Sequence, residues 1–413
     1  MKNKLALQQF IEQHPDWEKL LSEKPYCITI SRDELFGKKL IMFKYSQIDS
    51  DFGIDLVREC RGLILDESTY EVVSYAFNKF GNYGESYCPQ IDWKNCWVGQ
   101  KIDGSIIKVV RLSSGQLLIS TNGTIDAFKA SLPEQIGCKA KSFGDLFVEA
   151  LQNAKEADER KALKLNLTFP DGLETDPLKW LCSRIYPGHT YMFELTSPFN
   201  KVVVPWHETK VWLLGERDNT TFKETYFSDS FLRNVFDTPK VFNLGSIDEC
   251  ILAASNLPAD EEGYVVCDKN FNRVKVKSPT YVALHHMKNN GVLSYERGLE
   301  IVRGNELGEV LTYFPEFNQH LLEIKEKYNA FCAEMHNLEH KLCDWLAVEA
   351  YDCQPWLIAA GGSKRKELAK WAFQNTKYTG FVFAYADGKV HSADEWLQNM
   401  PSSKLVATLG FKD

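Results

Sequence analysis

The sequence predicts an α+β fold: an antiparallel-sheet domain over residues 1–290, followed by an all-helical domain over residues 291–413. Two observations predict it. Short apolar runs bounded by turn residues recur through the first two thirds of the chain, whereas the apolar residues beyond about residue 290 recur at helical spacing. With 413 residues, 44% of them hydrophobic, the chain is long enough for two or three cores. Residues 1–95 form an N-terminal subelement of the first domain.

Composition narrows the class of protein. The formal net charge of -8 excludes a basic nucleic-acid coat, so any contact with nucleic acid must come from local basic patches. Eleven cysteines without a C-x-x-C pair favour free thiols in a reducing compartment. The N-terminus is too polar for a signal peptide, and no apolar run is long enough to cross a membrane. We therefore expect a cytoplasmic protein without a membrane partner.

The expected elements follow in chain order. Periodicity and turn residues predict a helix over residues 1–23, a hairpin over 106–121 that turns at Ser113-Ser114-Gly115, mainly helices over 127–182, strands at Thr190–Leu195, Val202–Val204 and Lys210–Leu214, and a hairpin over 261–277. In the second domain, Gly380–Tyr385 fits either a strand or a buried helix.

The segment Lys101-Ile102-Asp103-Gly104-Ser105 precedes the apolar strand of the first hairpin. Side chains alternate along a strand, so Lys101 and Asp103 share one face. Gly104 allows a backbone to approach a ligand closely, because it has no Cβ. By itself, K-x-D-G is more typical of a solvated turn.

Three charged residues interrupt apolar strands or aromatic runs elsewhere. Arg61 opens a buried strand, Lys79 lies between Phe77 and Phe80, and Glu194 lies within an aromatic strand. An ion pair explains Arg61, and an aliphatic stem lying over aromatic rings explains Lys79. Burying Glu194 costs too much without a partner, which is a structural donor, a ribose hydroxyl or a metal-bound water.

The hairpin over 261–277 carries a ladder of cations. Arg273, Lys275 and Lys277 share one strand face, roughly 7 Å apart, and repel one another unless an anion binds them. An exposed edge strand is the alternative, since lysines protect such edges from aggregation. Glu262-Gly263 on the partner strand favours an anion site instead.

These residue types suit nucleotidyl transfer through a covalent lysine adduct. A lysine has a pKa of about 10.4, and lowering it by about three units requires roughly 4 kcal/mol. Crowding by Lys275, Lys277 and a divalent cation acts in that direction on Lys101. The same cations would hold a triphosphate and its leaving pyrophosphate.

Together these segments resemble the motifs of the covalent nucleotidyltransferases, the superfamily of RNA and DNA ligases and mRNA capping enzymes. Lys101–Ser105 resembles motif I, Phe193-Glu194 motif III, Lys210–Leu214 motif IIIa, Glu262-Gly263 motif IV and Lys275-Val276-Lys277 motif V. Three further segments are similar to the bacteriophage RNA ligase 1 family of tRNA-repairing ligases: Glu59–Gly62, Phe77–Asn82 and Ser278–Lys288. The resemblance covers about residues 40–290.

The resemblance implies an ATP-dependent RNA ligase with Mg²⁺ or Mn²⁺, an adenylyltransferase first domain, and RNA with 5′-phosphate and 3′-hydroxyl ends as partner. It implies Lys101 as the nucleophile that forms lysyl-AMP, and Glu194 and Glu262 near the metal. The ATP-binding residues that it implies are Tyr45, Arg61, Lys79, Asp103, Gly104, Glu194, Glu262, Gly263, Lys275 and Lys277. Tyr281 matches a family position linked to activity, and a role as a core tyrosine fits it equally.

The sequence departs from the family pattern in two places. Asn122 stands where the family has a basic residue, which affects how phosphate or the RNA end is handled. A carboxylate that the family offers to a metal has no clean counterpart, with Glu306 and Glu309 the nearest residues and neither assigned.

The family further implies a monomer in a phage-infected host cell, tRNA with a broken anticodon loop as substrate, and a C-terminal domain that selects tRNA. Two other classes of function stay open. A DNA ligase or capping guanylyltransferase shares the motifs, although no OB-fold segment is recognisable after Lys277. A non-catalytic RNA-end-binding protein on the same fold would not need Lys101, Glu194, Glu262, Lys275 and Lys277 together.

Overall fold

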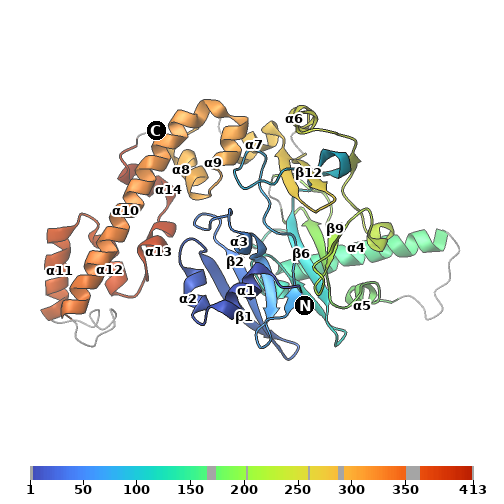
Figure 1. The fold of residues 1–413 in the computed structure, drawn as a ribbon, viewed down its shortest axis with the longest axis horizontal. Coiled ribbons are helices and arrows are strands. Elements are labelled where there is room, and N and C mark those ends of the chain that lie inside the picture. The colour runs from blue at the N-terminus through green and yellow to red at the C-terminus, as the bar shows by residue number, and fades with distance from the viewer. Residues whose placement is uncertain are drawn as a thin grey trace. The chain divides into compact units, whose positions relative to one another are not determined.

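The computed structural model describes residues 3–164, 174–200, 203–258, 261–286, 293–349 and 363–411. The chain divides into two compact units, residues 1–288 and 289–413, each with a hydrophobic core of its own. Figure 1 shows the strands gathered in the first unit and only helices in the second. The expected fold class, antiparallel sheets followed by a helical region, is confirmed.

Three antiparallel sheets build the first unit. The sheet orders are β1-β2-β3-β4, β10-β9-β8-β6-β7 and β11-β5-β12-β13. The strands are β1 (Ile28–Leu35), β2 (Lys38–Tyr45), β3 (Arg61–Asp66), β4 (Val72–Ser74), β5 (Cys96–Gln100), β6 (Ser105–Arg111), β7 (Leu117–Ser120), β8 (His189–Thr196), β9 (Lys210–Asp218), β10 (Glu224–Tyr226), β11 (Val241–Phe242), β12 (Gly263–Asp268) and β13 (Arg273–Lys277).

Helices cover these sheets. Those of the first unit are α1 (Ala6–Gln13), α2 (Trp17–Ser22), α3 (Asp55–Glu59), α4 (Phe143–Lys164), α5 (Pro177–Cys182), α6 (Ile247–Ser255) and α7 (Pro279–His286), with short 3-10 turns at 93–95, 127–129 and 231–234. Phe147 of α4 and Trp180 of α5 pack with Phe193 of β8 in the largest core. This packing positions β8, a neighbour of β6 in the second sheet, beside the site described below.

The second unit is helical throughout its described residues. Its helices are α8 (Tyr295–Arg303), α9 (Leu307–Tyr313), a 3-10 turn at 315–317, α10 (Asn318–Glu349), α11 (Ser363–Asn375), α12 (Thr379–Ala386), α13 (Ala393–Gln398) and α14 (Ser402–Thr408). The ambiguous segment 380–385 is a helix, and its Phe381 and Val382 are buried. None of the described helices combines the length and apolar composition that a membrane span needs.

Three expected elements differ from the structure. The helix over 1–23 is broken into α1 and α2, because Pro15 forces His14 into an extended conformation (φ -126°, ψ 106°). Between 130 and 142 the chain is not helical, since Pro133 and Gly137 interrupt it. Val203 and Val204 form no strand, because their amides donate to the carboxylate of Asp103 instead of a sheet neighbour; Val202 lies outside the described residues.

Candidate active site

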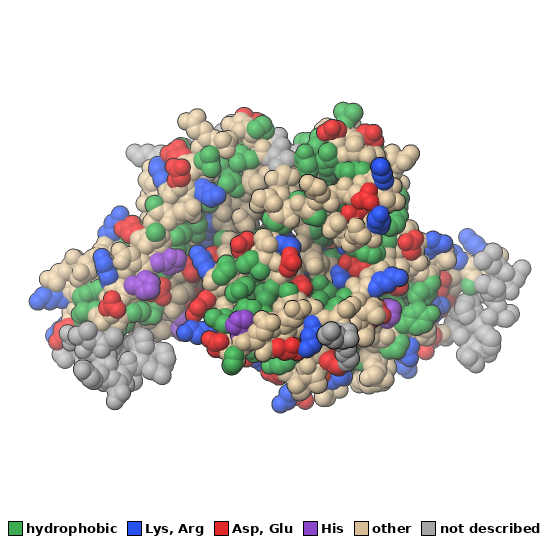
Figure 2. Space-filling view, in the orientation of Figure 1, with side chains coloured by type: hydrophobic (Ala, Val, Ile, Leu, Met, Phe, Trp, Pro, Cys, Tyr) green, Lys and Arg blue, Asp and Glu red, His purple; other side chains and the backbone are tan. Residues whose placement is uncertain are grey.

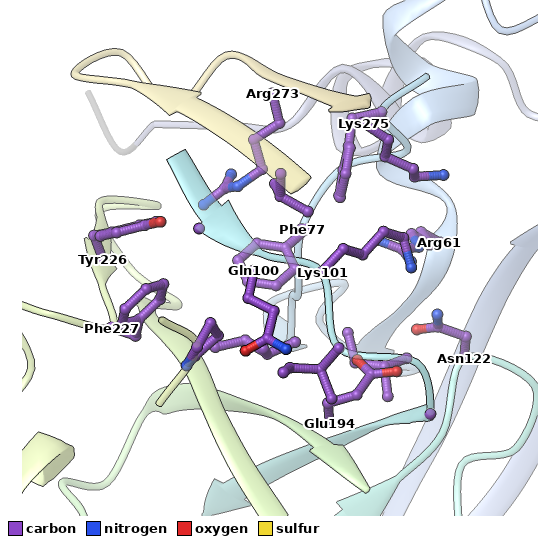
Figure 3. A pocket seen from close by; sticks show the side chains of 18 residues that line it. Arg61, Phe77, Gln100, Lys101, Asn122, Glu194, Tyr226, Phe227, Arg273 and Lys275 are labelled. Carbon is purple, nitrogen blue, oxygen red and sulfur yellow. The ribbon is translucent and has the colours of Figure 1, made fainter. Parts of the chain in front are cut away.

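A cavity of about 330 Å³ opens where the chain passes from β5 to β6, between the second and third sheets. That volume is within the usual range for small-molecule sites. Its charged lining comes from four separate segments, which supply Arg61, Lys101, Glu194 and, from one strand, Arg273 and Lys275. Figure 3 shows these residues around one hollow.

Lys101 is held at this cavity by β12. Its backbone N–H donates to the carbonyl of Gly263 over 2.8 Å, and its Nζ donates to Oε2 of Glu262 over 2.5 Å. On the other side, Oε1 of Glu262 lies 3.7 Å from Nζ of Lys277. Glu262 is only 4% exposed, so its charge needs both cations.

Strand register explains this meeting of distant residues. Gln100 of β5 pairs with Tyr264 of β12, and Gly263 pairs with Lys277 of β13. The residues just outside these pairs, Lys101 and Glu262, therefore become neighbours. The close β12–β13 contact needs glycine at 263, where φ is +136° and a Cβ would lie 2.2 Å from the carbonyl of Val276.

Glu194 supplies the second carboxylate. It lies in β8, opposite Ile106 of β6 and Trp212 of β9. Burial raises the pKa of Glu194 to about 7, and the nearby Lys101 opposes that rise. A carboxylate desolvated at a cavity wall is suited to accept a hydroxyl donor or to meet a cation.

Lys275 is an electropositive group at the same wall. Burial, reinforced by the charges of Lys79, Lys277, Lys101 and Arg61, lowers the pKa of Lys275. An anion in the cavity would relieve this repulsion.

Phe80 contacts both Lys275 and Arg61, with the Lys275 Nζ 5.1 Å and the Arg61 Cζ 5.5 Å from its ring centroid. Nη1 of Arg61 is buried without a hydrogen-bond partner among the described residues. Burial also raises the pKa of Tyr45, and Arg61 opposes that rise. Tyr45 itself lies outside the cavity lining, and the centroid of its ring lies 5.6 Å from the Nζ of Lys79.

Asp103 does not line the cavity, and its carboxylate instead bonds to groups on other segments of the first unit. Its Oδ2 accepts from the amides of Val203 and Val204, and its Oδ1 accepts from the hydroxyl of Tyr281 over 3.0 Å. Tyr281 is 2% exposed, so it is part of the core. Gly104 does line the cavity, and a Cβ there would lie 2.4 Å from the carbonyl of Leu195.

Arg273 lines the same cavity as Lys275, as the ladder of cations predicts, but its guanidinium already has an anionic partner within the protein. Its guanidinium pairs with Oε2 of Glu224 at 2.6 Å and lies 4.3 Å from the ring centroid of Phe77. Glu224 also pairs with Arg217. The charge of Arg273 is therefore already balanced inside the protein.

The other predicted residues divide among a second cavity, the first cavity and the second unit. Lys79 lines a second, adjacent cavity, with its Nζ 4.9 Å from the ring centroid of Phe52. Asn122 lines the first cavity, and its Oδ1 is buried without a partner among the described residues. Glu306 and Glu309 belong to the second unit, and the side chain of Glu309 is outside the description.

One residue near the site escaped sequence reasoning. Lys108 of β6 is fully buried and donates to the carbonyl of Gly62, next to Arg61. Burial lowers the pKa of Lys108 to about 7, and Arg61 adds to that effect. The signal was present, since a lysine interrupts the apolar run Ile106–Val110 just as Glu194 interrupts its own strand.

An antiparallel-sheet cavity with a paired lysine, two carboxylates and further cations defines a protein suited to bind a phosphorylated ligand. Residues 59–281, more than half of the chain, match the model of a family described as RNA ligase. The chain belongs to this family, the bacteriophage RNA ligase 1 family, as the motifs predicted.

Two individual relatives also carry RNA ligase in their names. A protein of Autographa californica nuclear polyhedrosis virus, which carries the name of a bifunctional polynucleotide kinase/RNA ligase, is 29% identical over 71% of this chain. The alignment spans 40% of that protein's length. An RNA ligase of Rhodothermus phage RM378 is 24% identical over 70% of this chain and 73% of its own.

Among solved structures, an archaeal ATP-dependent RNA ligase aligns with 78% of this chain and 79% of its own, at 13% identity and a TM-score of 0.41.

Proposed function

We propose that this chain is an ATP-dependent RNA ligase that joins RNA 5′-phosphate and 3′-hydroxyl ends through a covalent lysyl-AMP intermediate. One observation carries the proposal: the amine of Lys101 lies at the cavity, 2.5 Å from the buried carboxylate of Glu262, with Glu194 and Lys275 lining the same hollow. A nucleophile, a proton acceptor and cations for phosphate thus stand together. Membership of the RNA ligase family supports it.

In the first step, Nζ of Lys101 attacks the α-phosphorus of ATP. Glu262, which already accepts a hydrogen bond from Lys101, first takes a proton from the ammonium, and the free amine then forms the P–N bond. As this bond forms, the P–O bond to pyrophosphate breaks and the second proton leaves with the pyrophosphate. Arg61, Lys275 and Lys277 would bind the phosphates and balance charge on the departing pyrophosphate. Tyr45 and Lys79 would complete the ATP site from beside the cavity.

The later steps regenerate the enzyme. An oxygen of the RNA 5′-phosphate attacks the AMP phosphorus, the P–N bond breaks, and Lys101 regains a proton. A 3′-hydroxyl then loses its proton and attacks the RNA 5′-phosphorus, so that a phosphodiester forms and AMP leaves. Gly104 and Gly263 would let the nucleotide approach the backbone, and Asp103 with Tyr281 would keep the loop in place.

A divalent cation, Mg²⁺ or Mn²⁺, would supply positive charge for the phosphate oxygens when bound. Glu194 and Glu262 are the residues that would hold it, directly or through water. The fit of a divalent cation to this site is supported by Glu194, a desolvated carboxylate whose pKa is raised to about 7 mainly by burial.

The proposed substrate is RNA, and a broken tRNA anticodon loop is the form we favour. The viral relative's name joins a polynucleotide kinase to an RNA ligase, a combination that fits the repair of RNA ends. We assign tRNA selection to the helical second unit. The protein would act as a monomer in the cytoplasm of a phage-infected cell.

The test uses α-labelled ATP and Mg²⁺ with the full chain, followed by denaturation and acid. We expect label on the wild type and none on Lys101→Ala or Lys101→Arg. The arginine variant keeps a cation beside Glu262 and so controls for misfolding. The label should then move to a 5′-phosphorylated RNA and be released on sealing.

Other outcomes would replace the proposal. Labelling by GTP in place of ATP would indicate a capping guanylyltransferase, and transfer to DNA but not to RNA would indicate a DNA ligase. No label with either nucleotide, together with binding of RNA ends, would indicate a non-catalytic RNA-binding protein.

A further inference from the structure

A second cavity of about 390 Å³ lies beside the first one in the same unit. The two cavities share Phe80 and Arg273 as walls. A nucleic-acid strand whose end lies in the first cavity can therefore continue past Phe80 into the second cavity. Among the residues that line the second cavity and not the first, the proposed function gives a ligand only to Lys79, which lies beside the ATP site.

The charge of its lining is strongly positive. It contains Arg58, Lys79, Arg217, Lys223 and Arg273, against Glu224 as its one carboxylate. The chain as a whole carries a net charge of -8, and acidic and basic side chains are interspersed on the face seen in Figure 2. A cluster of five cations around one anion is thus a local feature, and it favours an anionic ligand.

Internal pairs balance only part of this charge. Glu224 pairs with both Arg217 and Arg273, and Arg58 pairs with Asp55. Lys223 is exposed and forms no ion pair within the described ranges. Nε of Arg217, a residue only 6% exposed, is buried without a partner among the described residues. The cavity therefore retains donors for an incoming anion.

Aromatic rings alternate with these cations. Phe80, Tyr87, Phe222 and Phe271 line the cavity, and all four are half-buried. Phe222 and Phe271 lie at the turns of two hairpins, β9–β10 and β12–β13, each with φ of +62°. Such a conformation is unfavourable for a bulky residue. Each turn pairs its ring with a polar neighbour that also lines the cavity, Lys223 or Asn270.

Cations for phosphates, rings for stacking and amides for base edges are the combination that binds single-stranded nucleic acid. We propose that this second cavity binds the single-stranded RNA nucleotides adjoining the end that reacts in the first cavity. The inference rests on the proposed RNA ligase function and adds the path of the RNA strand to it.

The experiment compares two exposed lysines of the first unit. Lys223→Glu reverses a charge at the cavity, and Lys179→Glu makes the same change on α5, away from both cavities. Binding of a 5′-phosphorylated single-stranded RNA is measured by fluorescence anisotropy at several salt concentrations. Lysyl-AMP formation from labelled ATP is measured in parallel.

We expect Lys223→Glu to weaken RNA binding about tenfold and to reduce the salt dependence of log K by about 0.7, the value for one phosphate contact on a single strand. Lysyl-AMP formation should keep the wild-type rate, and Lys179→Glu should match the wild type in both assays. Asn270→Asp, at the tip of the other hairpin, should weaken RNA binding in the same direction.

Two results would overturn the inference. Unchanged RNA binding by both cavity variants would put the strand elsewhere. Slower lysyl-AMP formation with unchanged RNA binding would assign the cavity to the triphosphate of ATP. If the wild type forms no lysyl-AMP but Lys223→Glu still loses RNA binding, the ligase proposal fails and the RNA site stands.

Discussion

Two buried lysines differ in how the protein compensates their charge. Lys155 of α4 is 4% exposed and lies 2.9 Å from Glu159, one helical turn away. Lys108 of β6 is fully buried, and the carbonyl of Gly62 is its one hydrogen-bond acceptor among the described residues. An ammonium with one neutral acceptor keeps most of its desolvation cost, so Lys108 should reduce stability when it is protonated.

We predict that Lys108→Met stabilises the protein in a pH-dependent way. Because the pKa of Lys108 is lowered to about 7 in the folded state, the unfolded chain binds a proton that the folded chain lacks between about pH 7 and pH 10. The wild type therefore gains stability from this residue as pH rises through that window. The advantage of the methionine variant should be roughly 3 kcal/mol larger at about pH 6 than at about pH 9.

Denaturant unfolding at the two pH values measures this difference. Lys155→Met is the matched control, since it removes a buried lysine that has a carboxylate partner. That variant should lose stability by a similar amount at both pH values. An equal effect of Lys108→Met at both pH values would contradict a lowered pKa.

Among the elements, the three-stranded ladder β5–β12–β13 decides where the reactive groups meet. Its register pairs Gly263 with Lys277 and brings Lys101 to the carbonyl of Gly263. A Cβ at Gly263 would lie 2.2 Å from the carbonyl of Val276 and 2.7 Å from Cα of Lys277, both backbone atoms. Backbone cannot rotate away as a side chain can, so the strands would have to separate.

We predict that Gly263→Ala costs about 3 kcal/mol of folding free energy and lowers lysyl-AMP formation at least about tenfold. The loss of activity has a local cause, because Glu262 moves with the strand that carries it. Gly245→Ala is the control, since the nearest atom to its Cβ is the flexible Glu249 Oε2 at 3.8 Å. A Gly263→Ala protein with wild-type labelling would show that the strand spacing is not required.

The whole chain consists of two units whose cores are separate. The core of the second unit runs from Leu299 to Phe411 and is tied by Arg303, which donates to the carbonyls of Leu397, Gln398 and Met400. The residues around both cavities all belong to the first unit. A unit with its own core and its own site can fold and react alone.

We predict that the fragment 1–288 unfolds cooperatively and forms lysyl-AMP at a rate within about threefold of the full chain. Sealing of a broken tRNA should fall more than sealing of a short single-stranded RNA, because tRNA selection is assigned to the second unit. Circular dichroism on heating and labelling with α-labelled ATP measure the two properties. A fragment that folds but cannot be labelled would contradict the assignment of the site to the first unit alone.

Local sequence features predicted much of the first unit. The hairpin predicted over 106–121 and the strand around Glu194 are as expected, because alternation and turn residues act over a few positions. Partners distant in the chain could not be predicted. Arg273 was expected to bind a ligand's anion, whereas Glu224, 49 residues away, already pairs with it.

By itself the sequence determined the family, the fold class and the residue types of the candidate site, since motif spacing and periodicity are properties of short segments. Only the tertiary structure decided which of those residues meet. Lys101 and Glu262 are 161 positions apart and become neighbours through strand register. Asp103 turned inward to Tyr281, and Lys79 lined the second cavity, because packing sets the direction of a side chain that its own segment leaves open.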